Sequence, residues 1–176
     1  MTDVSELDAL PADRAGEMFS ACCGSARWVE RMVALRPFGS RGAVCGAADE
    51  VWWSLSANDW REAFAHHPRI GAKMEPASQS SQARAWAAGE QSEVSHAPDD
   101  VRDQLASANQ EYERRFGYIY IVCATGKSAA EMLTLARNRL DNAPEVELRI
   151  AAEEQRKITR LRLAKLLDEN GKGDAP

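Results

Sequence analysis

Apolar residues recur at intervals of three and four along most of the chain, the spacing that places them on one face of an α-helix. The first such stretch runs from Ala15 to about Arg36, with Gly24 as a weak point inside it. Its apolar positions are Met18, Phe19, Cys22, Trp28, Val29, Met32 and Val33. The pattern therefore predicts two helical stretches that meet near Gly24, followed by a loop that opens at Pro37.

The next stretches are also helical. A second one carries Val51, Trp52 and Leu55. Asn58 is expected to cap a short helix, because its side chain can accept a hydrogen bond from the first turn. The apolar face of that helix is Trp60, Ala63, Phe64 and His67. This spacing places His67 on the buried face and His66 off it. Pro68 is expected to end the helix, because its ring disfavours the α conformation in the residue before it.

The middle of the chain predicts two more helices and one segment of a different kind. A Ser/Gln-rich stretch at 78–82 leads into a helix through Trp86 to about Glu93, and Pro98 starts a longer helix. Residues 116–124 are apolar and rich in aromatic and β-branched side chains. Because the chain offers this segment no sheet partner, we expect it to be an extended or irregular buried segment between helices.

Two helices are predicted after that segment. Ser128 and Glu131 form a capping box that starts the first of them. The final helix is expected from about Glu145 to Asp168. One face of it carries Leu148, Ala151, Gln155, Ile158 and Arg162. Residues 170–176 are expected to form a disordered tail.

The composition is typical of a globular protein. The 176 residues are 44% hydrophobic and 28% charged, which argues against wholesale disorder and against a coiled-coil rod. We therefore expect an all-α fold, a single-domain bundle of roughly seven to nine helices over residues 1–169. A net charge of -5 has the wrong sign for a protein whose whole surface binds nucleic acid.

Neither a membrane span nor a secretory signal is expected. No run of about 18 apolar residues is present, and the first residues lack a positive stretch followed by an apolar one. We expect a cytoplasmic protein. The cysteines Cys22, Cys23, Cys45 and Cys123 contain no Cys-x-x-Cys pair, so we interpret them as reduced and mostly buried small hydrophobic residues.

Two single residues and one adjacent pair are candidates for chemistry. His67 and Arg162 stand on faces that are otherwise apolar, and Glu90 and Gln91 place a carboxylate beside an amide. Each has a structural alternative: a core histidine with satisfied hydrogen bonds, an arginine paired with a structural carboxylate, and a solvated helix face. The pattern alone suits a small anionic substrate and acid/base chemistry without a cofactor.

Metal and nucleotide sites find no support in the sequence. His66 and His96 lack the spacing of metal ligands. Residues 126–128 read Gly-Lys-Ser, but the first glycine of a phosphate-binding loop would have to stand where Ile121 does. We expect neither a metal nor a bound nucleotide.

Four motifs follow one another along the chain. They are AHHPRIG from Ala65, WAAGEQS from Trp86, residues 109–112 with FGYIYI from Phe116, and KITRLRL from Lys157. Together they resemble the OHCU (2-oxo-4-hydroxy-4-carboxy-5-ureidoimidazoline) decarboxylases of urate degradation. The resemblance spans most of the chain, and four motifs in order are far more specific than any one of them.

The resemblance implies an all-helical single domain, often a homodimer, that needs no cofactor. Its implied reaction converts the ureidoimidazoline, a small anion, to (S)-allantoin and CO₂, downstream of urate oxidase and hydroxyisourate hydrolase. The leaving carboxylate of that substrate stands beside a C=N bond, so the imine can take up the electrons and no pyridoxal or thiamine is required.

By motif position, the resemblance implies His67 as the catalytic acid and Arg162 as the carboxylate ligand, with Arg160 off the buried face. Glu90 is implied as a third catalytic residue that holds the substrate. Further substrate contacts are implied for Pro68, Ala87, Gln91, Ile121, Val122, Cys123, Ala124 and Thr125. At Ala87 family members commonly have serine, so one hydroxyl contact is lost here.

Two other functions stay open. One is a non-catalytic helical module that binds a purine-derived anion, and the other is an interaction protein whose pocket is a relic. Ala87 favours these weakly, whereas His67, Glu90 and Arg162 favour the enzyme. Saturable binding of a urate analogue without turnover would identify the binding module.

Overall fold

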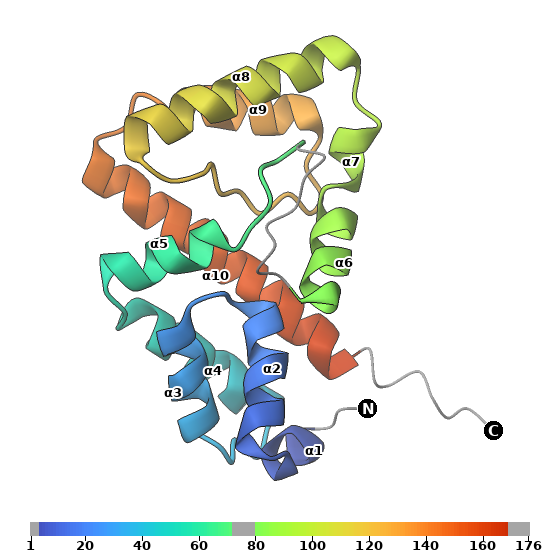
Figure 1. Cartoon of the computed structure of the whole chain (residues 1–176), viewed down its shortest axis with the longest axis vertical. Helices are drawn as coiled ribbons and strands as arrows, with labels where there is room; N and C mark the ends of the chain where they lie inside the picture. Colours follow the sequence, from blue (N-terminus) through green and yellow to red (C-terminus); the bar gives the residue numbers. More distant parts are fainter. Residues whose placement is uncertain (1–3, 72–79, 169–176) are drawn as a thin grey trace, which may run out of the picture. The chain divides into compact units, whose positions relative to one another are not determined.

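The structure is a computed structural model that describes residues 4–71 and 80–168 (Figure 1). Within these residues it contains ten α-helices and no strand, which confirms the all-α prediction, with one helix more than the predicted range. The helices are α1 (Val4–Ala9), α2 (Ala12–Cys22), α3 (Ala26–Ala34), α4 (Arg41–Trp53), α5 (Ala57–Ala65), α6 (Ser81–Glu90), α7 (Ser92–Ser95), α8 (Asp99–Phe116), α9 (Ala129–Arg139) and α10 (Pro144–Asp168). The tail expected at 170–176 lies outside the described residues.

The chain divides into two compact units. One consists of Met1–Ala63 with Arg156–Pro176, and the other of Phe64–Gln155. Helices α5 and α10 each contribute residues to both units. The two units are therefore called the terminal unit and the central unit below.

The terminal unit has an aromatic core. Helix α3 packs against both α2 and α4. The rings of Phe19 and Trp28 meet edge to face with centroids 5.9 Å apart, and the Trp28 Nε1 atom donates to the carbonyl oxygen of Ala48 at 3.1 Å. The predicted break lies at residues 23–25, where Ser25 caps α3 by accepting the N–H of Trp28. The expected weak point at Gly24 is thus confirmed.

The start of α5 differs from the prediction. Asn58 is inside the helix, and the preceding Ser56 makes the capping contacts. The Ser56 hydroxyl accepts the N–H of Asp59 at 3.3 Å, and the Asp59 carboxylate accepts the N–H of Ser56 at 2.9 Å. These reciprocal bonds satisfy two backbone donors, whereas an asparagine cap would satisfy one.

The central unit is built on α8 and α9, which lie side by side (Figure 1). Helix α8 starts just after Pro98, as predicted, and buries Leu105, Ala108 and Tyr112. It ends at Phe116, and the following Gly117 has a φ of 77°, which suits a residue without a side chain. The Ser128–Glu131 capping box begins α9 as expected.

An extended segment separates α8 from α9. Its residues 118–124 are all buried and, as predicted, form neither strand nor helix. The Tyr120 hydroxyl donates to the carbonyl oxygen of Met132 on α9 at 3.2 Å. A buried extended backbone must find other partners for its polar groups, because it has no ladder of its own.

Candidate active site

His67 lies in the turn that follows α5. The helix ends at Ala65 rather than continuing to His67, because the N–H of His67 bonds to the carbonyl oxygen of Phe64 at 3.0 Å and tightens the last turn. His66 and His67 are both half-buried, so the predicted contrast between them is wrong, and Pro68 is buried. The Nε2 atom of His67 lies 2.7 Å from Oε1 of Gln155, a fully buried side chain of α10.

Glu90 and Gln91 lie where α6 gives way to α7. Gln91 is the residue between the two helices, and its Oε1 accepts the N–H of Gly71 at 3.2 Å. Glu90 is half-buried at the end of α6, and Ala87 is buried one turn earlier. The motif thus places a carboxylate and an amide side chain at the C-terminal end of α6.

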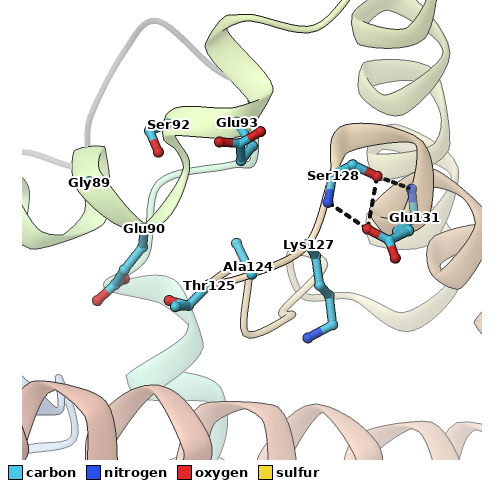
Figure 2. A pocket seen from close by; sticks show the side chains of 10 residues that line it. Gly89, Glu90, Ser92, Glu93, Ala124, Thr125, Lys127, Ser128 and Glu131 are labelled. Carbon is cyan, nitrogen blue, oxygen red and sulfur yellow. Dashed lines mark hydrogen bonds between the residues drawn. The ribbon is translucent and has the colours of Figure 1, made fainter.

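A pocket of about 440 Å³, lined mostly by polar and charged residues, lies beside this turn in the central unit. Figure 2 shows one wall with Glu90 and Glu93 and the other with residues 124–128 and Glu131. Of the predicted site residues, Glu90, Ala124 and Thr125 line it. The described residues that line the pocket do not include His67 or Gln91. The volume suits a small molecule.

Three charged side chains make hydrogen bonds to the backbone of Ile121 and Cys123 in the extended segment. Arg139 donates to the carbonyl oxygen of Ile121 at 2.8 Å, and Glu154 accepts the N–H of Cys123 at 2.7 Å. Lys127 donates from Nζ to the carbonyl oxygen of Cys123 at 2.8 Å. These side chains satisfy backbone N–H and carbonyl groups of the extended segment that a neighbouring strand would otherwise bind.

Arg139 itself belongs to a buried ionic cluster. Its Nε donates to Glu147 at 2.7 Å, and Glu147 also accepts from Asn142 and from the hydroxyl of Tyr112. The guanidinium lies over the rings of Tyr112 and Tyr120, 5.6 Å and 4.9 Å from their centroids. Burial works against the charge of Arg139, but the hydrogen bond and the charge of Glu147 raise its pKa. The cation that holds Ile121 therefore stays protonated.

Burial also governs the tyrosines and cysteines near this segment. It raises the pKa of Tyr120 to about 12 and raises the pKa of Tyr112 further. Burial, followed by the charge of Glu154, raises the pKa of the Cys123 thiol. All four cysteines are free thiols, and Cys123 is protonated near neutral pH. These groups therefore contribute neutral side chains.

In the terminal unit, Arg160 and Arg162 differ sharply. The Arg160 guanidinium binds Asp49 with two bonds, Nε to Oδ1 at 3.0 Å and Nη2 to Oδ2 at 2.7 Å. Arg156 binds the same carboxylate at 2.8 Å. Arg162 is only 3% exposed, and its Nη1 lies 3.4 Å from the carbonyl oxygen of Ala21. The fork of Arg160 thus already binds a structural carboxylate.

Several residues of this arrangement were not predicted from the sequence. They are Gln155 as a partner of His67, and Arg139, Glu154 and Lys127 as partners of the extended segment. Gln155 was placed on the buried face of the last helix, but no pattern indicates which side chain it meets. Within residues 4–71 and 80–168, no three His, Cys, Asp or Glu side chains gather where they could bind a metal ion.

Residues 8–164 match the family model described as OHCU decarboxylase. The chain belongs to the OHCU decarboxylase family. Among curated relatives, it is 38% identical over 155 residues to the uric acid degradation bifunctional protein TTL of Arabidopsis thaliana, covering 88% of this chain and 48% of that protein. It is 33% identical over 81 residues to the 2-oxo-4-hydroxy-4-carboxy-5-ureidoimidazoline decarboxylase of Amia calva, covering 45% and 46% of the two chains.

Two solved structures resemble this OHCU decarboxylase family member. A crystal structure of OHCU decarboxylase in the presence of (S)-allantoin has a TM-score of 0.75 and 35% identity, covering 86% of this chain and 98% of that one. A crystal structure of (S)-allantoin synthase has a TM-score of 0.68 at 17% identity, covering 94% and 54%, and supports the fold alone. The chain spans 48% of the length of the Arabidopsis relative, about half. It spans 33% of the length of a uric acid degradation bifunctional protein of Bacillus.

No helix among the described residues is both long enough and apolar enough to span a bilayer.

Proposed function

We propose that this chain decarboxylates 2-oxo-4-hydroxy-4-carboxy-5-ureidoimidazoline to (S)-allantoin and CO₂ without a cofactor. The observation that carries the proposal is the family match over residues 8–164. The OHCU decarboxylase solved in the presence of (S)-allantoin supports it, since this chain covers 98% of that one at 35% identity.

His67 is proposed as the general acid. As CO₂ leaves, the electrons of the breaking C–C bond pass to the adjacent C=N group. The nitrogen of that group takes up the proton of the neighbouring hydroxyl, which becomes a carbonyl, and the carbon of that group must gain a further proton. A histidine that titrates near neutral pH can supply that proton. Delivery to one face of the ring gives one enantiomer. The half-buried position of His67, with a hydrogen-bond partner on its ring, suits a group that must be oriented.

Arg162 is proposed as the ligand of the leaving carboxylate. A forked guanidinium binds a carboxylate with two parallel bonds and so fixes its orientation. The exposure of Arg160, whose side chain is 49% exposed, supports Arg162 over Arg160, because water screens an exposed charge. The burial of Arg162 supports it further.

Glu90 and Gln91 are proposed to hold the ring and the ureido group, with Pro68 as a wall. The pocket lined by Glu90, Ala124 and Thr125 supports a binding role for this region. The carbonyl oxygen of Ile121 and both backbone polar groups of Cys123 already bond to Arg139, Glu154 and Lys127. We therefore expect a substrate to bond to other backbone groups of the segment. Those of Val122 and Thr125 are proposed to make these contacts.

The family resemblance also supports a wider setting. We propose a homodimer in the cytoplasm that works beside urate oxidase and hydroxyisourate hydrolase. Those two enzymes would generate the unstable ureidoimidazoline. Sedimentation of the purified chain tests the dimer independently of catalysis.

The test is circular dichroism of the urate oxidase and hydroxyisourate hydrolase reaction, with and without this protein. Spontaneous decay gives racemic allantoin and no lasting signal. A signal of (S)-allantoin that grows faster in proportion to protein concentration is the expected result. A flat trace with folded protein and fresh intermediate would contradict the proposal and favour a module that binds the anion without turnover.

A further inference from the structure

We propose that Gln155 is a positioning residue that orients the His67 ring and keeps its Nε2 atom protonated. The Gln155 amide oxygen lies 2.7 Å from that nitrogen. Gln155 is 0% exposed, and an amide buried to this degree is costly unless it is hydrogen bonded. The contact with His67 provides such a bond.

The geometry distinguishes the two ring nitrogens. A neutral imidazole carries one N–H and one lone pair, and an amide oxygen accepts but cannot donate. With that oxygen beside Nε2, the proton of the neutral ring resides on Nε2 and the lone pair on Nδ1. The bond that the neighbouring group makes thus selects the tautomer.

If His67 is the general acid, as the proposed function has it, the tautomer determines which ring nitrogen donates the proton. When the ring is charged, both nitrogens carry protons, and the Nε2 proton is held by Gln155. The proton given to the substrate carbon then comes from Nδ1: the Nδ1–H bond breaks, a C–H bond forms, and the ring returns to its neutral Nε2–H form.

The backbone on both sides supports a fixed geometry. The N–H of His67 is held by the carbonyl oxygen of Phe64 at 3.0 Å, and the rigid ring of Pro68 follows. Gln155 stands on the 25-residue helix α10, and the preceding Glu154 holds the N–H of Cys123 at 2.7 Å. Two consecutive residues of one helix therefore fix the histidine turn and the extended segment.

The first experiment reads the tautomer directly. Long-range ¹H–¹⁵N NMR of the intact chain, at a pH where the ring is neutral, reports which nitrogen of His67 carries the proton, with the spectrum of His67→Gln assigning its signals. We expect the Nε2–H form. A neutral ring protonated at Nδ1 would overturn the proposal, whether or not the protein is a decarboxylase.

The second experiment changes the partner. Gln155→Leu removes the acceptor at similar size, and kcat is expected to fall about 10- to 100-fold, the cost of a displaced catalytic group, while His67 shifts toward a mixture of tautomers. Gln155→Glu restores an acceptor and is expected to restore the Nε2–H form and part of kcat. Gln110→Leu, the same change at an exposed position of α8, is the matched control.

The outcomes distinguish the proposed catalytic role of His67 from the proposed positioning role of Gln155. If His67→Ala keeps full activity, the proposed role of His67 fails, while the NMR result still stands. If Gln155→Leu lowers kcat but leaves the His67 nitrogen signals unchanged, Gln155 acts only through the fold and the positioning role is wrong. Should Gln155→Leu fail to fold, the tautomer of the unmodified chain and of Gln155→Glu decides.

Discussion

At the scale of single residues, two arginines two positions apart on α10 make the sharpest comparison. Arg162→Gln is expected to lower kcat/KM by at least about thirtyfold, because removing one partner of a buried charge pair costs about 2–5 kcal/mol. Arg160 is 49% exposed and bound to Asp49. Arg160→Gln should change kcat/KM little, since a surface pair is worth about 0–1 kcal/mol. Steady-state kinetics of both variants checks this, and equal losses would contradict it.

The histidines offer a second pair. His67→Ala is expected to lower kcat by about 10²- to 10⁴-fold, the contribution of a general acid. His66→Ala, which changes the neighbouring half-buried ring, should keep most of the activity. Initial rates of the (S)-allantoin signal measure both. Full activity of His67→Ala would remove it from the mechanism.

Ala87 allows a gain rather than a loss. Ala87→Ser restores the hydroxyl that family members commonly have, and one hydrogen bond of about 0.5–1.5 kcal/mol should lower KM about 2- to 10-fold. Ala85→Ser adds the same group at an exposed position of the same helix and should leave KM unchanged. A KM that does not respond at position 87 would mean that no substrate group faces it.

The residue patterns identified polar side chains on otherwise apolar helix faces. They did not predict which residues these side chains contact. Arg162 was expected on a buried face and is buried there. The glutamine beside His67 and the arginine at Ile121 come from positions 88 and 18 residues away in the chain. Such pairs depend on tertiary packing, which helical periodicity does not contain.

At the scale of elements, the extended segment depends on the buried pair of Arg139 and Glu147. Glu147→Gln leaves the guanidinium charge without its partner and is expected to destabilise the fold by about 3–5 kcal/mol. Arg69→Gln breaks the exposed pair of Arg69 and Glu113 in the same unit and should cost no more than about 1 kcal/mol. Urea denaturation compares the two. Similar midpoints would argue against the buried pair as an anchor.

Element boundaries were predicted best where a local signal fixes them. The Ser128–Glu131 capping box and the start of α8 after Pro98 act within a few residues, and both are as expected. Ser56 replaced Asn58 as the cap because two side-chain bonds outweigh one. The extended form of residues 118–124 was predicted from the lack of a sheet partner, but its charged anchors were not.

At the scale of the whole molecule, the all-α fold and the family followed from patterns that run the length of the chain. Helical periodicity predicts helices, and the ordered motifs span residues that the family model also matches. The arrangement of two compact units was not predicted. The chain passes between them inside α5 and α10, where the sequence has no linker to mark a boundary.

The buried thiols give the molecule internal reporters of local opening. Burial raises the pKa of Cys23 in the terminal unit to about 12 and also raises that of Cys123 in the central unit. Only the thiolate reacts with alkylating reagents, so each cysteine must become exposed before it is labelled. In a Cys22→Ala, Cys45→Ala background, the two labelling rates would report the opening of each unit separately. A ligand bound against residues 121–125 would slow the labelling of Cys123, which maps binding without any measurement of turnover.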